Sequence, residues 1–60
     1  MVFENIKALC EEKHISISEL EKKAGLGNGT VRKWRNVSPN LDKLTIVANT
    51  LGVELVQLIK

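Results

Sequence analysis

The 60-residue sequence predicts an all-α protein built from five short helices. Two observations lead to this fold class. Apolar side chains recur at helical rather than alternating spacing in every stretch longer than six residues. Glycine, proline and capping residues then separate those stretches from one another. Because a chain of this length forms one domain at most, we expect residues 1–60 to share a single small core.

The first two helices are predicted over residues 2–13 and 17–24. Residues 2–13 carry apolar side chains at every third or fourth position, as one face of an amphipathic helix does. Ser16 and Glu19 fit a capping box, in which each side chain accepts a hydrogen bond from the other residue's backbone N–H group. The second helix should end at residue 24, because Gly25 suits the left-handed position just past a helix.

A third helix is predicted over residues 28–35, with Gly27 or Asn28 as its N-cap. Val31 and Trp34 share one face of this helix, so we expect both side chains in the core rather than on the surface. The opposite face would carry Gly29, Arg32, Lys33 and Asn36.

The last two helices are predicted over residues 41–51 and 54–59. Pro39 keeps the residue before it out of the helical region, and Asn40 can cap the helix that follows. That helix should end before Gly52. Its expected apolar face is Leu41, Leu44, Ile46 or Val47, Ala48 and Leu51, and the short final helix carries Leu55, Leu58 and Ile59.

The charged residues are unevenly distributed along the chain, although the net charge is only +2. Residues 1–21 are acidic overall and residues 42–60 are balanced. Residues 22–41 contain no acidic residue but carry Lys22, Lys23, Arg32, Lys33 and Arg35. Such a segment favours a local anion-binding face over a generally basic protein, with an ordinary solvated surface as the alternative.

Several function classes find little support in the sequence. The single cysteine, Cys10, allows no intramolecular disulfide and fits a reducing cytoplasm, where we expect the chain to reside. The first residues, MVFENIK, lack the pattern of a signal peptide, and no apolar run is long enough to span a membrane. Cys10 and His14 lie four positions apart, but nothing supplies the further ligands of a metal site. We therefore expect no enzyme activity, cofactor, metal, membrane partner or small-molecule ligand.

Residues 15–36, ISISELEKKAGLGNGTVRKWRN, resemble the helix-turn-helix of the lambda/434 repressor and Cro-like family. The matching apolar residues and turn glycine are Leu20, Ala24, Gly25, Leu26, Val31 and Trp34. The resemblance continues through residues 38–59 and so covers nearly the whole chain. The segments ELEKKAGL and NGTVRKW are most similar to small repressors of Gram-positive phages and mobile elements. The resemblance implies a compact five-helix bundle of the lambda-repressor type, with its helix-turn-helix unit at residues 17–35.

The resemblance also implies a function and a partner. It implies a bacterial or phage-encoded, nucleoid-associated repressor. This repressor would bind a pseudo-palindromic operator in double-stranded DNA as a homodimer, at least on the DNA, with residues 28–35 in the major groove. The expected base contacts come from Asn28, Gly29, Thr30, Arg32 and Lys33. The expected phosphate contacts come from Ser16, Ser18, Arg35, Asn36, Asn40 and Lys43.

The sequence departs from the family pattern at three places. Ile17 stands where the family often has a glutamine that contacts a phosphate. Glu21 stands where a small residue usually lets the two helices pack closely, so we expect its side chain to lean out of that contact. Cys10 and Arg35 stand where many members pair an arginine with a glutamate. That ion pair is therefore absent, and we expect Arg35 to be free to contact a phosphate.

An apolar strip near the C-terminus suggests a second kind of partner. It consists of Val53, Val56 and Ile59, and family members often have aspartate where Val56 stands. We expect the strip to form dimer contacts. The alternative is that the whole fold serves as a protein-interaction module, such as an antitoxin or a repressor-partner domain.

Overall fold

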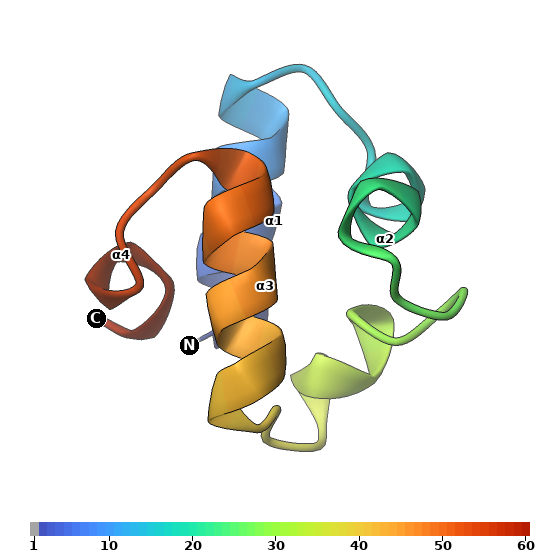
Figure 1. The fold of residues 1–60 in the computed structure, drawn as a ribbon, viewed down its shortest axis with the longest axis vertical. Coiled ribbons are helices and arrows are strands. Elements are labelled where there is room, and N and C mark those ends of the chain that lie inside the picture. Colours follow the sequence, from blue (N-terminus) through green and yellow to red (C-terminus); the bar gives the residue numbers. More distant parts are fainter. Residues whose placement is uncertain (1) are drawn as a thin grey trace.

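The computed structural model describes residues 2–60, in which short helices alternate with tight turns (Figure 1). Within this described part there are four α-helices: α1, Val2–Glu12; α2, Ile17–Ala24; α3, Leu41–Leu51; and α4, Val56–Ile59. A single turn of 3-10 helix, η1, spans Arg32–Arg35. Residues 2–60 contain no strand. The all-α prediction is confirmed, with four α-helices and one 3-10 turn in place of five α-helices.

Helix α1 joins the two sides of the molecule. It contacts α4 on one side and both α2 and η1 on the other, while α2 also packs against α3. In Figure 1, α2 and the η1 region lie to one side of α3, and α4 lies to the other. The buried apolar residues come from every element and are Phe3, Ile6, Cys10, Leu20, Val31, Trp34, Leu44, Val47, Ala48, Leu51 and Leu58.

The three longer helices all end in the same backbone motif. The residue that follows the last helical turn is left-handed in each case, with φ of 60° at His14, 72° at Gly25 and 70° at Gly52. The next N–H group then bonds a carbonyl five residues back, as Leu26 does to Glu21 at 2.8 Å. This bond closes each helix and reverses the chain, so that short helices can pack around one small core.

The boundaries predicted for residues 17–24 and 41–51 are confirmed. The first helix ends one residue earlier than predicted, and the final helix begins at Val56 rather than at residue 54. The prediction that Leu41 belongs to the apolar face of its helix is wrong, because Leu41 lies at the very start of α3 and is 63% exposed. Of the two alternatives for the middle of that helix, Val47 is buried and Ile46 is 40% exposed.

The predicted third helix is wrong over its first half. Residues 28–31 form a turn, and only Arg32–Arg35 are helical. The reason is Gly29, whose φ of 87° does not fit a right-handed helix. Val31 and Trp34 are nevertheless buried, as their spacing predicts. The structure therefore keeps the expected core contacts while presenting a turn where a helical surface was expected.

Candidate nucleic-acid interface

The buried carboxylate of Glu21 joins α2 to the recognition segment, defined here as residues 27–36. Only 2% of Glu21 is exposed. Its Oε1 accepts a hydrogen bond from the N–H of Gly29 at 3.0 Å, and its Oε2 accepts one from the N–H of Val31 at 2.9 Å. The expectation that this side chain leans out of the contact is therefore wrong. The turn at Gly29 aims backbone donors at α2, and a carboxylate satisfies them where a small apolar residue could not.

Glu21 also takes over the capping role that the sequence assigned to the segment itself. Gly27 has no side-chain acceptor, and only its carbonyl takes part, accepting the N–H of Thr30 at 3.1 Å. The N–H of Val31, which an N-cap at Asn28 would bond at its third following residue, is bonded by Glu21. The side chain of Asn28 lies exposed. The prediction of Gly27 or Asn28 as N-cap is thus corrected.

A shallow groove runs between the recognition segment and the start of α3. It is about 350 Å³ in volume. It brings Thr30 and Lys33, predicted to contact bases, together with Asn40 and Lys43, predicted to contact phosphates. The remaining lining residues are Trp34, Val37, Ser38 and Pro39, and none of the eight described residues around the groove is acidic. The groove is therefore suited to an anionic ligand.

The start of α3 adds to the positive character of this groove. The Oδ1 of Asn40 accepts the N–H of Lys43 at 2.9 Å, which confirms Asn40 as the cap of this helix. Asn40 and Lys43 are both exposed. The helix dipole at such a terminus favours anions, and the ammonium groups of Lys33 and Lys43 act in the same direction.

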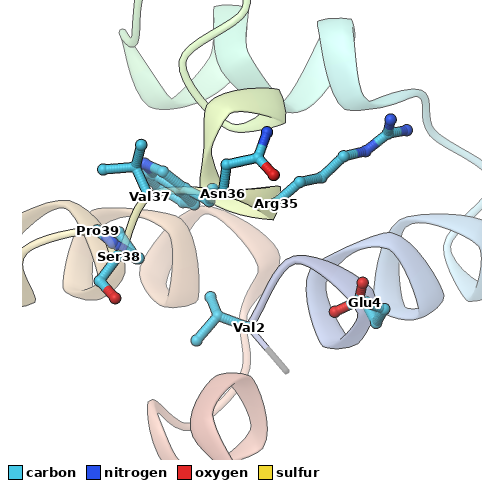
Figure 2. Close-up of a pocket in the computed structure, with 8 residues that line it drawn as sticks. Val2, Glu4, Arg35, Asn36, Val37, Ser38 and Pro39 are labelled. Atoms are coloured by element: carbon cyan, nitrogen blue, oxygen red, sulfur yellow. The ribbon is translucent and has the colours of Figure 1, made fainter.

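Arg35 lies away from this groove. Its guanidinium carbon is 4.9 Å from the centre of the Phe3 ring, a cation–π contact that ties η1 to α1. Figure 2 shows Arg35 reaching out from the end of η1 while Val37 projects on the opposite side. Arg35 and Asn36 line a smaller cavity of about 180 Å³ together with Val2 and Glu4. One face of the Arg35 guanidinium is thus occupied by Phe3, while the side chain is exposed, and its contact with a phosphate stays a prediction.

Cys10, the partner position in the family's ion pair, is buried in the core. Burial raises the pKa of its thiol, and the nearby Glu11 raises it further. The thiol is therefore kept neutral, and it behaves as a small apolar residue. The contact between Arg35 and Phe3 joins the same two elements that the missing ion pair would join.

The predicted phosphate contacts at the start of α2 lie outside the groove. The Oγ of Ser16 accepts the N–H of Glu19 at 3.0 Å, and the Oε1 of Glu19 accepts the N–H of Ser16 at 2.9 Å. The capping box is therefore confirmed. Hydrogen bonding to the Glu19 carboxylate, first from the Ser16 backbone N–H and then from the Ser16 side chain, lowers the pKa of Glu19. Ile17 and Ser18 are both partly buried.

The apolar strip near the C-terminus is exposed in part. Val56 is 57% exposed and Ile59 is 53% exposed, whereas Val53 packs against the core. Asn5 holds α4 in place, because its Nδ2 donates to the carbonyls of Leu58 at 2.9 Å and Lys60 at 3.0 Å. The exposed part of the strip therefore lies on a well-anchored helix, on the other side of α3 from the recognition segment (Figure 1).

Other kinds of site were sought over residues 2–60. No group of three or more histidine, cysteine, aspartate or glutamate residues is placed to hold a metal ion within this part of the chain. None of the helices that the structure describes has the length and apolarity needed to cross a membrane. The groove beside the recognition segment is therefore the site with the most distinctive chemistry.

Sequence reasoning missed Glu21 and the groove residues Val37, Ser38 and Pro39. Glu21 carried a signal, because an acidic residue stands where the family pattern has a small one, and Gly27 after it has no side-chain oxygen to accept a backbone N–H. The loop residues carried none. Their place in the groove depends on how the loop folds back onto α3, which local patterns do not specify.

Comparison with known proteins gives the family of the chain. The family model described as Helix-turn-helix matches residues 6–58, which is most of the sequence. No curated protein and no solved structure gives a significant match. The matched family is one of sequence-specific DNA-binding regulators and is generally not enzymatic. Together with the fold and the basic groove, this match means that the chain belongs to the lambda/Cro-like helix-turn-helix family.

Proposed function

We propose that residues 1–60 form one DNA-binding domain that represses transcription. In this proposal two copies bind a pseudo-palindromic operator, with half-sites about one helical turn apart. The recognition segment enters the major groove. The bound dimer then blocks the access of polymerase to the DNA. Such a protein works at the nucleoid, in keeping with a bacterial or phage-encoded origin, and its assignment to a Gram-positive phage or mobile-element subgroup stays a prediction.

The observation that carries the proposal is the composition of the groove. Lys33 from the recognition segment and Lys43 from α3 line it together, and none of the described residues that line it is acidic. The start of α3 offers its dipole at the same place. This arrangement supports contact with two chemically different parts of a duplex at once, the base edges from one wall and the phosphates from the other.

The proposed base contacts keep the residues predicted from the sequence, with their geometry changed by the turn. The exposed amide of Asn28 can bond adenine N6 and N7, and Arg32 and Lys33 can bond guanine. Gly29 would allow close approach of the backbone. The full set is Asn28, Gly29, Thr30, Arg32 and Lys33, and the proposed phosphate contacts are Ser16, Ser18, Arg35, Asn36, Asn40 and Lys43.

The test is selection from a random duplex pool at physiological salt, where binding to charge alone is weak. The proposal expects enrichment of a two-fold pseudo-palindrome. Replacing Lys33 and Lys43 together by alanine should weaken binding to it and reduce the dependence of affinity on salt. The matched control replaces Lys7 and Lys13 of the first helical region, which are exposed and lie outside the groove. An unenriched pool, or equal losses in both double variants, contradicts the proposal.

The exposed side chains of Val56 and Ile59 favour a second candidate function. Both are more than half exposed on an anchored helix, which suits contact with a protein. In the repressor proposal this contact is the dimer interface. In the alternative the chain is an antitoxin or a repressor-partner domain. Loss of function on replacing Arg32 and Lys33 by alanine supports DNA as the partner, whereas loss only on Val56→Asp supports a protein.

A further inference from the structure

We propose that Glu21 is a positioning residue for DNA recognition. Its buried carboxylate holds the first turn of the recognition segment in the shape that presents Asn28 and Thr30 to the bases. This inference rests on the proposed function, because it concerns how the same site distinguishes one sequence from another. Glu21 itself touches no DNA in this proposal, since its side chain is enclosed by protein.

Glu21 is unusual among charged side chains, because it is buried and both of its carboxylate oxygens accept hydrogen bonds. Among residues 2–60 it is the only buried charged side chain. Both of its oxygens are used, on N–H groups of Gly29 and Val31 that are two residues apart. No buried side-chain nitrogen or oxygen in the described part of the chain lacks a partner. A carboxylate buried at this position thus has its charge offset by two backbone donors.

The two N–H groups that Glu21 accepts, those of Gly29 and Val31, lie on either side of Thr30, and Gly29 directly follows Asn28. A regular helix would fix these residues through its own ladder of hydrogen bonds, but residues 28–31 form a turn. Within that turn the N–H of Thr30 bonds the carbonyl of Gly27 at 3.1 Å. The direction of the Asn28 side chain therefore depends strongly on a carboxylate that belongs to another helix.

A fixed conformation of residues 28–31 matters for base recognition. A side chain that bonds two atoms of one base loses discrimination when its backbone moves, whereas a lysine on a phosphate tolerates movement. Loosening the turn should accordingly reduce the preference for the selected sequence more than the affinity for duplex DNA in general. A residue that only stabilised the fold would not separate these two quantities.

The experiment compares Glu21→Gln with Glu19→Gln. Both changes remove one negative charge from α2, and both residues accept backbone N–H bonds. Glutamine at position 21 keeps one acceptor oxygen and turns an amide donor towards the second N–H group. The measured quantity is the ratio of Kd values for a scrambled duplex and for the duplex selected by the wild-type protein. Amide hydrogen exchange at Gly29 and Val31 is followed in the same samples without DNA.

Glu21→Gln should lower the ratio about tenfold, the size expected for one lost base contact, and should speed exchange at both amides. Affinity for the scrambled duplex should stay the same or rise, because a negative charge is removed. Glu19→Gln should leave the ratio and the exchange unchanged. Glu21→Asp keeps both oxygens on a shorter side chain, and we expect an intermediate ratio; it also serves if Glu21→Gln does not fold.

A wild-type ratio in folded Glu21→Gln or Glu21→Asp, or equal losses in the Glu19 and Glu21 variants, overturns the positioning role alone. A wild-type protein that prefers no duplex overturns the proposed function instead, together with the base readout that Glu21 would serve. The two failures are thus distinguished by the wild-type measurement.

Discussion

Two glutamates of α2, two residues apart, both accept hydrogen bonds from backbone N–H groups, one at the start of the helix and the other from its middle. Glu19 accepts the N–H of Ser16, three residues before it, in a fully exposed capping box. Glu21 accepts the N–H groups of Gly29 and Val31, eight and ten residues after it, while only 2% exposed. The same side chain therefore supports a local motif in one case and a tertiary contact in the other.

The difference in burial decides how much each glutamate matters. An exposed backbone donor that loses its partner can bond water instead, so its loss costs little. A buried donor has no such replacement, and its desolvation remains uncompensated. Although the two glutamates make similar hydrogen bonds, the structure depends far more on Glu21 than on Glu19.

The largest expected effect follows from removing the buried carboxylate. Glu21→Ala leaves the N–H groups of Gly29 and Val31 without their acceptors, and it should lower the free energy of unfolding by about 3 kcal/mol. Urea unfolding followed by circular dichroism measures this loss. Glu19→Ala, the matched control on the same helix, should lose much less. Equal losses in the two variants would mean that burial is not what separates them.

These two glutamates also mark what the sequence could predict. The ends of α2 and α3 follow from short motifs, Ser16 with Glu19, Asn40, and the glycines at 25 and 52, and both helices were located correctly. All the residues of each motif lie within a few positions of one another, so a helix end can be predicted from the local sequence alone. Val31 and Trp34 are likewise predicted to be buried from local information, because their three-residue spacing puts both on one face of a helical turn.

The recognition segment was only partly predicted, because its shape depends on a partner in another helix. Local spacing favoured a helix over residues 28–35, whereas the left-handed Gly29 and the Glu21 carboxylate together stabilise a turn. The spacing still predicts that Lys33 lies on the face opposite Val31 and Trp34, and in the structure Lys33 lines the groove. Groove residues from the loop, such as Ser38, depend on tertiary packing and could not be predicted from local patterns.

The next largest effect should come from Gly29 itself. Its φ of 87° lies in the left-handed region, its N–H bonds Glu21, and a Cβ built there meets no atom within 4 Å. Gly29→Ala therefore introduces conformational strain without a clash, and it should lower the free energy of unfolding by about 1–2 kcal/mol. Gly29→Asn should lose less, since asparagine tolerates the left-handed region better. Thermal unfolding without DNA measures both.

Gly27→Ala is the control for this prediction. Gly27 is not left-handed, and its added Cβ would lie 3.3 Å from the Oγ1 of Thr30, a flexible side chain. Its effect on stability should be smaller than that of Gly29→Ala. A Gly29→Ala protein as stable as the wild type would show that the turn can rearrange without strain, and that Glu21 does not fix one conformation.

A smaller and opposite effect is expected at the end of α1. His14 occupies the same left-handed position as Gly25 and Gly52, with φ of 60°, and its side chain is exposed. His14→Gly removes the strain of a Cβ there but increases the freedom of the unfolded chain, so the net gain should be about 0.5–1 kcal/mol. Urea unfolding measures it. A loss of stability would mean that the His14 side chain makes a contribution larger than its backbone strain.

The smallest effect concerns the pKa of Glu19, which is held below the ordinary value of 4.5 mainly by the Ser16 backbone and then by the Ser16 side chain. A lowered pKa in the folded protein stabilises it above the unfolded pKa, and this contribution is lost as the pH falls through the folded value. Ser16→Ala removes the hydroxyl but keeps the backbone N–H, so the pKa of Glu19 should rise only part of the way. Carboxyl titration by NMR measures this change.

The same titration sharpens the comparison between the two glutamates. Because the capping box closes within residues 16–19, the pKa of Glu19 should be the same in Glu21→Gln as in the wild-type protein, even where the recognition segment has loosened. A Glu19 pKa that rises in Glu21→Gln would mean that the start of α2 depends on the segment beyond its end. The local motif and the tertiary contact would then be one coupled structure, and the independence inferred from their hydrogen bonds would be lost.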